Sequence, residues 1–317
     1  MPASSANGPP DISVVLATYD RRHSLPRAIA SVQAQDGVRF ELIVVDDASS
    51  DDTLAYLASL ADPRIRTITR DRNRGPSAAR NSGLAAARAD VVAFLDSDDA
   101  YRPGRLAAPL AAFAADTGLV ATLSSAVKHD RNGAREALIP AVKLAAPAFE
   151  WALICDLMPV EATSITVRRK AALAAGGFCE SLRLTEDREF LIRLARRGGG
   201  ELLSDLLWEK FSGDDNLSND WAKAGQGLAA YVRERPEYAG RFRKVGSYLA
   251  TRVLIADLRM GLWGAFRRDL AALRAAGLIG ADPVRLFRDH REVRRYRRTM
   301  SSAAALAGLA GPPASWR

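Results

Sequence analysis

Short apolar runs alternate with helix-like segments over the first hundred residues of the chain. The runs are rich in β-branched residues, as expected of strands buried on both faces. The expected strands are residues 12–18, 41–45, 64–69 and 91–95. The expected helices are residues 24–35, the segment containing Leu54, Leu57 and Leu60, and residues 75–87. Strands alternating with helices predict an α/β fold with a Rossmann-like, mostly parallel central sheet.

The pattern is less regular after Leu106. Strands are expected at residues 119–127, 163–167 and 201–207, and helices at residues 169–175 and 186–197. The run Gly198-Gly199-Gly200 predicts a helix end followed by a turn. From Trp221 onward the apolar residues recur at helical spacing, which predicts a helical C-terminal subdomain.

Composition is that of an ordinary globular protein. The chain has 317 residues, of which 48% are hydrophobic and 26% charged. No apolar run approaches the ~18–20 residues that cross a bilayer, and residues 1–10 lack the pattern of a signal peptide. We therefore expect a cytoplasmic protein with a short disordered lead at residues 1–10. Two cysteines, Cys155 and Cys179, are too few for a disulfide framework or a four-thiolate zinc site.

Basic residues are concentrated toward the C-terminus. Residues 220–317 contain 19 basic and 8 acidic side chains, whereas the first 219 residues are slightly acidic. This asymmetry predicts a catalytic domain at residues 11–219 and a basic helical region at residues 220–317. The arginines of residues 285–298 form either a solvated helix face or a contact with the anionic inner face of a membrane or with a lipid-linked phosphate acceptor. No nucleic-acid-binding motif accompanies them, so we expect no nucleic-acid partner.

Acidic clusters follow two of the expected strands. Asp46 and Asp47 end one strand, and Asp96, Asp98 and Asp99 follow another. Ligands of open α/β sheets bind at the carboxyl ends of the strands, and we expect the two acidic strands to be adjacent there. An Asp-x-Asp pair supplies the hard oxygen ligands that Mg²⁺ and Mn²⁺ prefer. Neither a Walker phosphate loop nor a dinucleotide Gly-x-Gly-x-x-Gly motif is present, which argues against an NTPase and a nicotinamide enzyme.

Six motifs together resemble the family 2 glycosyltransferases of GT-A fold, in order and in spacing, over residues 11–200. They are ATYDRR (17–22), VVDDASSDDT (44–53), NRGPSAARNSG (73–83), AFLDSDD (93–99), GGFCESL (176–182) and TEDREFLIRLARRG (185–198). The resemblance implies a hexosyltransferase-type enzyme that moves a sugar from a nucleotide diphosphate donor to a hydroxyl acceptor, with inversion at the anomeric carbon. It also implies a divalent metal, Mn²⁺ or Mg²⁺, and a role in polysaccharide, glycolipid or glycoconjugate synthesis on a sugar, lipid-linked or other acceptor.

The resemblance also implies roles for single residues. Thr18 and Tyr19 would line the nucleotide pocket, and either Asp46 or Asp47, with Asp47 favoured, would accept a hydrogen bond from the base, which suits uracil. Arg80 would lie near the nucleotide and its phosphates. Asp96 and Asp98 would face the ribose and the metal, with Asp99 close to one of them. Asp187 would be the catalytic base at the start of a helix, with Glu186 its acidic neighbour.

Three departures from the family pattern affect the expectations. The family often has a histidine near Gly213 that reaches the metal or diphosphate, and this chain has none there. Asp214, Asp215 or water would have to replace it as a ligand. Cys179 stands where an aspartate is usual. The QxxRW motif of processive synthases is missing, which favours an enzyme that adds a single sugar.

Two other classes of function remain open. A catalytically idle relative would bind sugar nucleotides as a partner subunit. A signalling receiver domain also has paired aspartates at a strand end and binds Mg²⁺. A receiver would begin at the Asp46 strand, however, and would leave the segment from Thr185 to Asp187 without a role.

Overall fold

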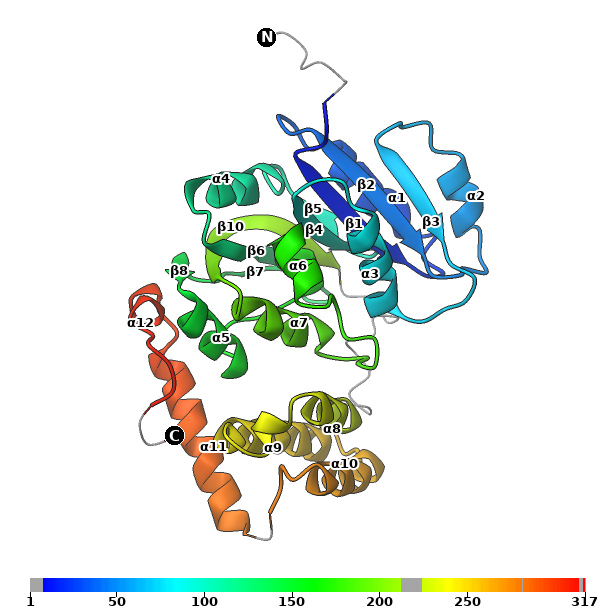
Figure 1. Ribbon diagram of the computed structural model, residues 1–317. Coiled ribbons are helices and arrows are strands. Elements are labelled where there is room, and N and C mark those ends of the chain that lie inside the picture. Colours follow the sequence, from blue (N-terminus) through cyan, green and yellow to red (C-terminus); the bar gives the residue numbers. More distant parts are fainter. Residues whose placement is uncertain (1–7, 212–223, 281, 314–315, 317) are drawn as a thin grey trace.

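A computed structural model describes residues 8–211, 224–280, 282–313 and 316 (Figure 1). The strands are β1 (Ile12–Thr18), β2 (Phe40–Asp46), β3 (Ile65–Thr69), β4 (Val91–Asp96), β5 (Ala100–Tyr101), β6 (Leu119–Asp130), β7 (Gly133–Ala137), β8 (Val142–Leu144), β9 (Ile165–Arg168) and β10 (Gly199–Phe211). The helices up to residue 211 are α1 (Leu25–Gln33), α2 (Thr53–Ala58), α3 (Pro76–Ala86), α4 (Ala107–Ala115), α5 (Ala146–Ile154), the 3₁₀ helix η1 (Ala162–Ser164), α6 (Arg169–Ala174) and α7 (Glu186–Ala195).

These strands form one mixed sheet in the order β3-β2-β1-β4-β9-β6-β10-β5, with β7 paired to β6 and β8 to β10. Strands β3, β2, β1, β4, β6 and β10 run in one direction, while β9 is antiparallel to both of its neighbours. The sheet is therefore mostly parallel, and the expected α/β fold is confirmed.

Helices cover both faces of the sheet, because the parallel strands carry apolar side chains on both sides. Val14 and Leu16 of β1 pack in one apolar cluster with Ile29 of α1, whereas Val15 of the same strand packs in the other with Ala79 of α3. Residues of α2 and α4 join the α1 side, and residues of α5, α6 and α7 join the α3 side. The alternation along β1 thus divides the core between two helical layers.

The sequence predicted β1 to β4 and the helices between them to within a few residues, but it missed α4, α5, β5, β7 and β8. The predicted turn at Gly199 and Gly200 is wrong, since both residues begin β10. A Cβ atom on Gly200 would lie 2.5 Å from ring carbons of Phe149, and one on Gly199 would lie 2.6 Å from the carbonyl oxygen of Leu144. These glycines serve close packing of α5 and β8 against the strand rather than a turn.

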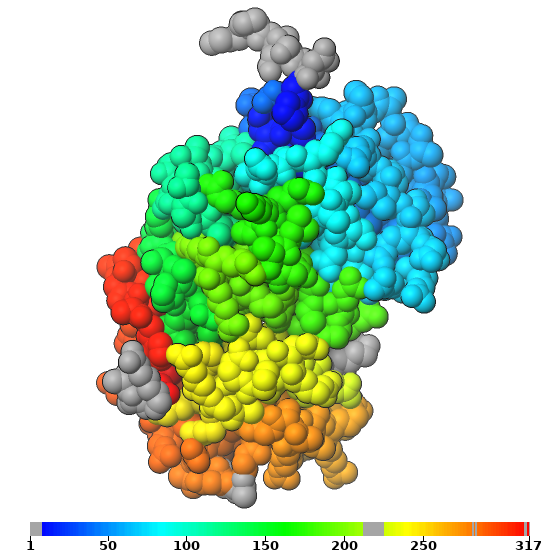
Figure 2. Space-filling view, viewed as in Figure 1, coloured from blue at the N-terminus to red at the C-terminus, as the bar shows by residue number. Residues whose placement is uncertain are grey.

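The C-terminal part of the described chain is helical. It contains α8 (Ala224–Glu234), the 3₁₀ helix η4 (Pro236–Tyr238), α9 (Arg243–Arg259), α10 (Trp263–Ala275), α11 (Pro283–Thr299) and α12 (Ala303–Ala307). Helices α8, α9 and α10 lie at the end of the molecule opposite the N-terminal strands, and α11 leads from that end to α12, which lies beside β8 (Figures 1 and 2). The expected helical subdomain is present, while the predicted domain boundary at residues 219 and 220 and the lead at residues 1–7 lie outside the described residues. No helix among the described residues is long and apolar enough to span a membrane.

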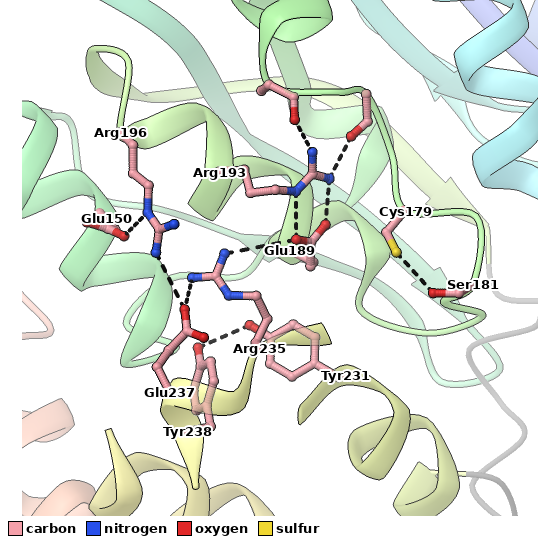
Figure 3. A network of polar contacts seen from close by, with 12 residues as sticks. Glu150, Cys179, Ser181, Glu189, Arg193, Arg196, Tyr231, Arg235, Glu237 and Tyr238 are labelled. Carbon is pink, nitrogen blue, oxygen red and sulfur yellow. Dashed lines mark hydrogen bonds and ion pairs between the residues drawn. The ribbon is translucent and has the colours of Figure 1, made fainter. Parts of the chain in front are cut away.

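Polar contacts join this helical part to the back of α7 (Figure 3). Arg235, which is 3% exposed, lies between Glu189 of α7 at 3.9 Å and Glu237 of η4 at 2.6 Å. Arg196, just after α7, pairs with Glu150 of α5 at 2.7 Å and with the same Glu237 at 3.4 Å. The C-terminal helices are therefore packed onto the helix that begins at Glu186.

Candidate active site

The acidic strand ends lie at one edge of the sheet, on either side of β1. The register pairs Thr18 with Asp46 on β2 and Ala17 with Asp96 on β4. The sequence predicted that the two acidic strands are adjacent. This is wrong, because β1 lies between β2 and β4. This order places Thr18 between the two carboxylate clusters.

A pocket of about 640 Å³ opens at this edge. Most of the residues named from the sequence line it, whereas Asp46 and Asp187 do not. Its lining residues are Ala17, Thr18, Tyr19, Asp20, Arg21, Asp47, Asn73, Gly75, Pro76, Ala79, Arg80, Asp96, Ser97, Asp98, Asp99, Arg183, Leu184, Thr185, Glu186 and Lys210.

The residues that the resemblance assigns to the nucleotide pocket differ in whether their polar atoms already have hydrogen-bond partners. Thr18 is 4% exposed, and its Oγ1 has no hydrogen-bond partner among the described residues, so it is available to a ligand. Asp47 is already engaged. Its Oδ2 accepts hydrogen bonds from the backbone N–H groups of Arg74 at 3.0 Å and Gly75 at 2.6 Å, and its Oδ1 lies 3.1 Å from Nε of Arg70. Asp47 therefore shapes the loop before α3 as well as facing the pocket.

Asp46 is fully buried and is not among the residues that line the pocket. Its Oδ2 accepts a hydrogen bond from the backbone N–H of Ser49 at 3.1 Å, which closes the turn after β2. Of the two aspartates left open by the sequence, only Asp47 lines the pocket.

Thr163 of η1 holds the acidic turn after β4 by two hydrogen bonds. The Thr163 hydroxyl donates to Oδ2 of Asp99 at 2.6 Å and accepts from the backbone N–H of Asp96 at 3.1 Å. Burial, followed by the negative charge of Asp96, raises the pKa of both Asp98 and Asp99. The turn therefore concentrates negative charge that only a cation or a proton would relieve.

Arg80 connects the acidic turn to the start of α7. Its side chain is only 6% exposed, and it donates to Oδ1 of Asp96 at 2.7 Å and to Oε1 of Glu186 at 2.9 Å. Burial opposes the charge of this guanidinium, but the two carboxylates raise its pKa above the ordinary value. Arg80 thus holds two acidic pocket residues that are 90 positions apart in the sequence.

Glu186 and Asp187 form the first turn of α7, as expected. Thr185 precedes them in a left-handed conformation, with φ of 64°, which sets the direction of the helix start. Burial, followed by the charge of Glu186, raises the pKa of Asp187 to about 7. A carboxyl group that titrates near neutral pH is suited to accept a proton from a substrate. Glu186 lines the pocket, whereas Asp187, the next residue, is half-buried and is not among the lining residues.

The donor atoms at the acidic turn fit a divalent cation in part. Among the described residues no group of three His, Cys, Asp or Glu side chains is arranged to hold a metal ion. Arg80 occupies one oxygen of Asp96, and Thr163 occupies one oxygen of Asp99, which leaves Asp98 the least committed of the three. Such a set suits Mg²⁺ or Mn²⁺ when the ion takes its other ligands from water and a diphosphate.

Two of the cationic pocket residues, Arg183 and Lys210, lie outside the six motifs. Arg183 lies over Gly75, where a Cβ atom would come within 2.3 Å of Nη1 of the guanidinium, and Gly75 also has φ of 92°. Lys210 reaches the pocket from the end of β10. Neither residue carries a local sequence signal, because the fold alone brings both to the acidic edge.

The sheet order, the helices on both faces and an acidic pocket beside β1 define a GT-A glycosyltransferase fold. A sequence profile of Glycosyl transferase family 2 matches residues 13–174, about half of the chain. The chain therefore belongs to the family 2 glycosyltransferases.

Relatives of known name match about a third of the chain. The succinoglycan biosynthesis protein ExoO of Rhizobium meliloti is 53% identical over 97 residues, which cover 31% of this chain and 28% of that protein. The UDP-Glc:alpha-D-GlcNAc-diphosphoundecaprenol beta-1,3-glucosyltransferase WfgD of Escherichia coli is 36% identical over 95 residues, covering 30% of this chain and 38% of that protein. The matched segments thus span well under half of these relatives.

Solved structures resemble nearly the whole chain. TarS 1–349 of S. aureus in complex with UDP-GlcNAc has a TM-score of 0.59 at 16% identity and covers 91% of both chains. The mannosyltransferase PcManGT of Pyrobaculum calidifontis, in complex with GDP-Man and Mn²⁺, has a TM-score of 0.59 at 20% identity, covering 97% of this chain and 88% of that one. At these identities the likeness establishes the fold.

Proposed function

We propose that this chain transfers a sugar, with inversion, from a nucleotide diphosphate donor to an acceptor hydroxyl. The observation that carries the proposal is the pocket itself, where Thr18 and Asp47 at the nucleotide end and Glu186 at the start of α7 face one cavity. UDP-sugars are the favoured donors, on the strength of the UDP-GlcNAc complex of TarS and the UDP-Glc in the name of WfgD.

Inversion requires one displacement at the anomeric carbon. The acceptor oxygen forms the new bond while the bond from the anomeric carbon to the diphosphate oxygen breaks, and the electron pair leaves with the nucleoside diphosphate. The acceptor proton passes to a general base, for which we assign Asp187. Glu186, held by Arg80, supplies the neighbouring charge that helps keep the pKa of Asp187 near neutrality.

A divalent cation would be held by Asp98 and Asp96, with Asp99 behind them. When bound, such an ion neutralises charge on the leaving diphosphate. The Mn²⁺ complex of PcManGT supports this assignment. A third protein ligand from Asp214 or Asp215 lies outside the described residues.

The names of the relatives favour an acceptor in polysaccharide assembly. ExoO takes part in succinoglycan biosynthesis, and the name of WfgD states a diphosphoundecaprenol-linked acceptor. We extend this to a lipid-linked or polysaccharide acceptor, used at the cytoplasmic face of a membrane. The exposed arginines of α11, beside the exposed Val284 and Phe287, would contact anionic lipid there.

The test is transfer by the purified chain from a panel of UDP- and GDP-sugars, with and without Mn²⁺, followed as release of the nucleoside diphosphate. Release that depends on an added acceptor supports the proposal. Tight donor binding without release favours the idle partner subunit, the alternative that the sequence left open. Family membership does not favour the receiver domain.

A further inference from the structure

The last strand of the sheet ends at the acidic turn. Strand β10 is antiparallel to β5, and the register pairs Glu209 with Ala100. In an antiparallel pair the next residue on one strand lies beside the preceding residue on the other. Lys210 therefore lies alongside Asp99, and it lines the pocket together with Asp98 and Asp99.

A stacked arginine fixes this strand end to the acidic turn. The guanidinium carbon of Arg27 lies 3.7 Å from the ring centroid of Phe211, the residue after Lys210. The same guanidinium donates from Nη2 to the backbone carbonyl of Asp98 at 2.6 Å. Because one side chain holds both segments, the position of Lys210 relative to Asp98 is set by the fold.

Among the described residues, Lys210 forms an ion pair with a carboxylate that also pairs with a second lysine. Lys128 of β6 is aligned with Lys210 in the β6–β10 register, and both ammonium groups pair with Glu161, Lys210 at 3.4 Å. The two lysine side chains are similarly covered, at 20% and 23% exposed. Glu161 alone cannot neutralise both ammonium groups. Only Lys210 of the pair lines the pocket, where it also faces the carboxylates of Asp96 and Asp99.

We propose that Lys210 binds the diphosphate of the nucleotide-sugar donor and neutralises the charge that develops there as the sugar departs. The proposal rests on the proposed function, since it needs a diphosphate in this pocket. A charged hydrogen bond from a positioned ammonium group is among the stronger contacts to a phosphate. The residue would supply, from the end of β10, a cation in the region where the family often has a histidine that this chain lacks.

The experiment compares Lys210→Gln with the matched control Lys128→Gln by titration calorimetry. The affinities of the wild type for UDP and for GDP are measured first. The diphosphate that binds more tightly, the corresponding monophosphate and the nucleoside are then each titrated into every variant, once with Mn²⁺ and once with EDTA. We expect Lys210→Gln to weaken diphosphate binding about tenfold or more under both conditions, as loss of a charge-assisted contact does. Nucleoside affinity should change less than twofold, and Lys128→Gln should resemble the wild type.

Three outcomes would overturn the proposal. Unchanged diphosphate affinity in Lys210→Gln, or an equal loss for nucleoside and diphosphate, would mean that the lysine only balances the acidic turn. An equal loss in Lys128→Gln would point to the Glu161 cluster instead. Lys210→Arg, which keeps the charge, should recover most of the diphosphate affinity. If the wild type binds neither UDP nor GDP, the proposed function itself is contradicted. If the wild type binds a diphosphate and Lys210→Gln binds it equally well, only the role of Lys210 is contradicted.

Discussion

Arg80 pairs with two acidic residues that line the pocket. Its guanidinium joins Asp96, after β4, to Glu186, at the start of α7. The resemblance implied that Arg80 lies near the nucleotide and its phosphates. In the structure Arg80 lines the pocket, and both of its terminal nitrogens donate to carboxylates. At the residue scale, Arg80 therefore sets the spacing between the acidic turn and the first turn of α7.

Replacing the assigned base tests the chemistry directly. Asp187→Asn keeps the size of the side chain but cannot accept a proton at neutral pH. Turnover should fall by ~10²–10⁴-fold, the usual contribution of a general base, while donor affinity stays near that of the wild type. Initial transfer rates and donor titrations measure the two quantities. Near wild-type turnover would show that the base lies elsewhere.

The pH dependence of transfer should report the same carboxyl group. The base acts only when unprotonated, so kcat/KM should rise with pH through about 7, where the pKa of Asp187 lies. Glu186→Gln removes a negative charge that raises this pKa, and the rise should therefore move to lower pH. The measurement is kcat/KM of the wild type and of Glu186→Gln as a function of pH between about 5 and 9. A profile that Glu186→Gln leaves in place would contradict the assignment of Asp187.

The proposed metal site can be tested at Asp98. Asp98→Asn keeps the shape of the side chain but removes its charge, so Mn²⁺-supported UDP binding should weaken by about tenfold or more. Binding in EDTA should change much less. Calorimetry measures both, and Asp36→Asn, at an exposed turn remote from the pocket lining, is the control. Equal affinities with Mn²⁺ for Asp98→Asn and the wild type would rule out Asp98 as a ligand.

The candidate site was partly predictable because several of its residues follow buried strands. Thr18, Asp47 and Asp96 each stand at or just after the end of a strand, and parallel strands bring such positions together. Lys210 was not predictable in this way, since its place depends on the pairing of Glu209 with Ala100, more than one hundred residues earlier. The sequence also could not show which carboxylate oxygens are free to bind a ligand. Arg80 hydrogen-bonds to Asp96, and Thr163 to Asp99, only in the folded chain.

Helix α7 is held by an ionic cluster centred on Asp156, which follows α5 in a left-handed conformation with φ of 53°. Arg188, the residue after Asp187, pairs with Oδ1 of Asp156 at 2.7 Å. Arg252 of α9 and Arg297 of α11 pair with Oδ2 at 2.7 and 2.9 Å. One carboxylate therefore couples the first turn of α7 to two C-terminal helices.

Weakening the ion pairs of this cluster should destabilise the first turn of α7 more than the rest of the fold. In Asp156→Asn three arginines lose their charged partner, at a cost of about 1–3 kcal/mol. Amide hydrogen exchange in the first turn of α7 should rise, and kcat should fall while the KM for the donor changes less than twofold. Glu292→Gln, which removes an α9–α11 ion pair with Lys244, should leave α7 protected. Unchanged exchange in Asp156→Asn would contradict the coupling.

Elements were predictable where their apolar pattern was simple. Strands β1, β2 and β4 are continuous apolar runs, and α1 and α3 follow them with helical spacing. Helices α4 and α5 were missed because their sequences, AAPLAAFAA and APAFEWALI, are apolar on nearly every side and contain proline. Such segments show no helical period, and tertiary packing against the sheet decides their structure.

The charge of the whole molecule is concentrated on the C-terminal helices. Arg285, Arg288, Arg291, Arg294, Arg295 and Arg298 of α11 are all exposed. If this face contacts anionic lipid, the protein should sediment with vesicles containing phosphatidylglycerol but not with phosphatidylcholine alone. Binding should fall steeply as salt rises from 50 to 500 mM, because screening shortens the reach of the charges.

A matched pair of variants locates that surface. Arg291→Gln/Arg294→Gln should weaken vesicle binding, whereas Arg39→Gln/Arg64→Gln, which removes the same charge near the N-terminal strands, should not. Vesicle binding that is insensitive to salt, or that both double variants lose equally, would favour a solvated helix face.

The place of β10 in the sheet has a consequence for how the chain acquires its structure. This strand, the last in the described sequence, lies between β6 and β5, and it also pairs with β8. Until the ribosome has released residue 211, the edges of these earlier strands have no partner. Such long-range pairing slows folding, and unpaired edges expose a nascent chain to aggregation. The strand edges that pair with β10 therefore stay exposed from the time each earlier strand leaves the ribosome until residue 211 has also left it.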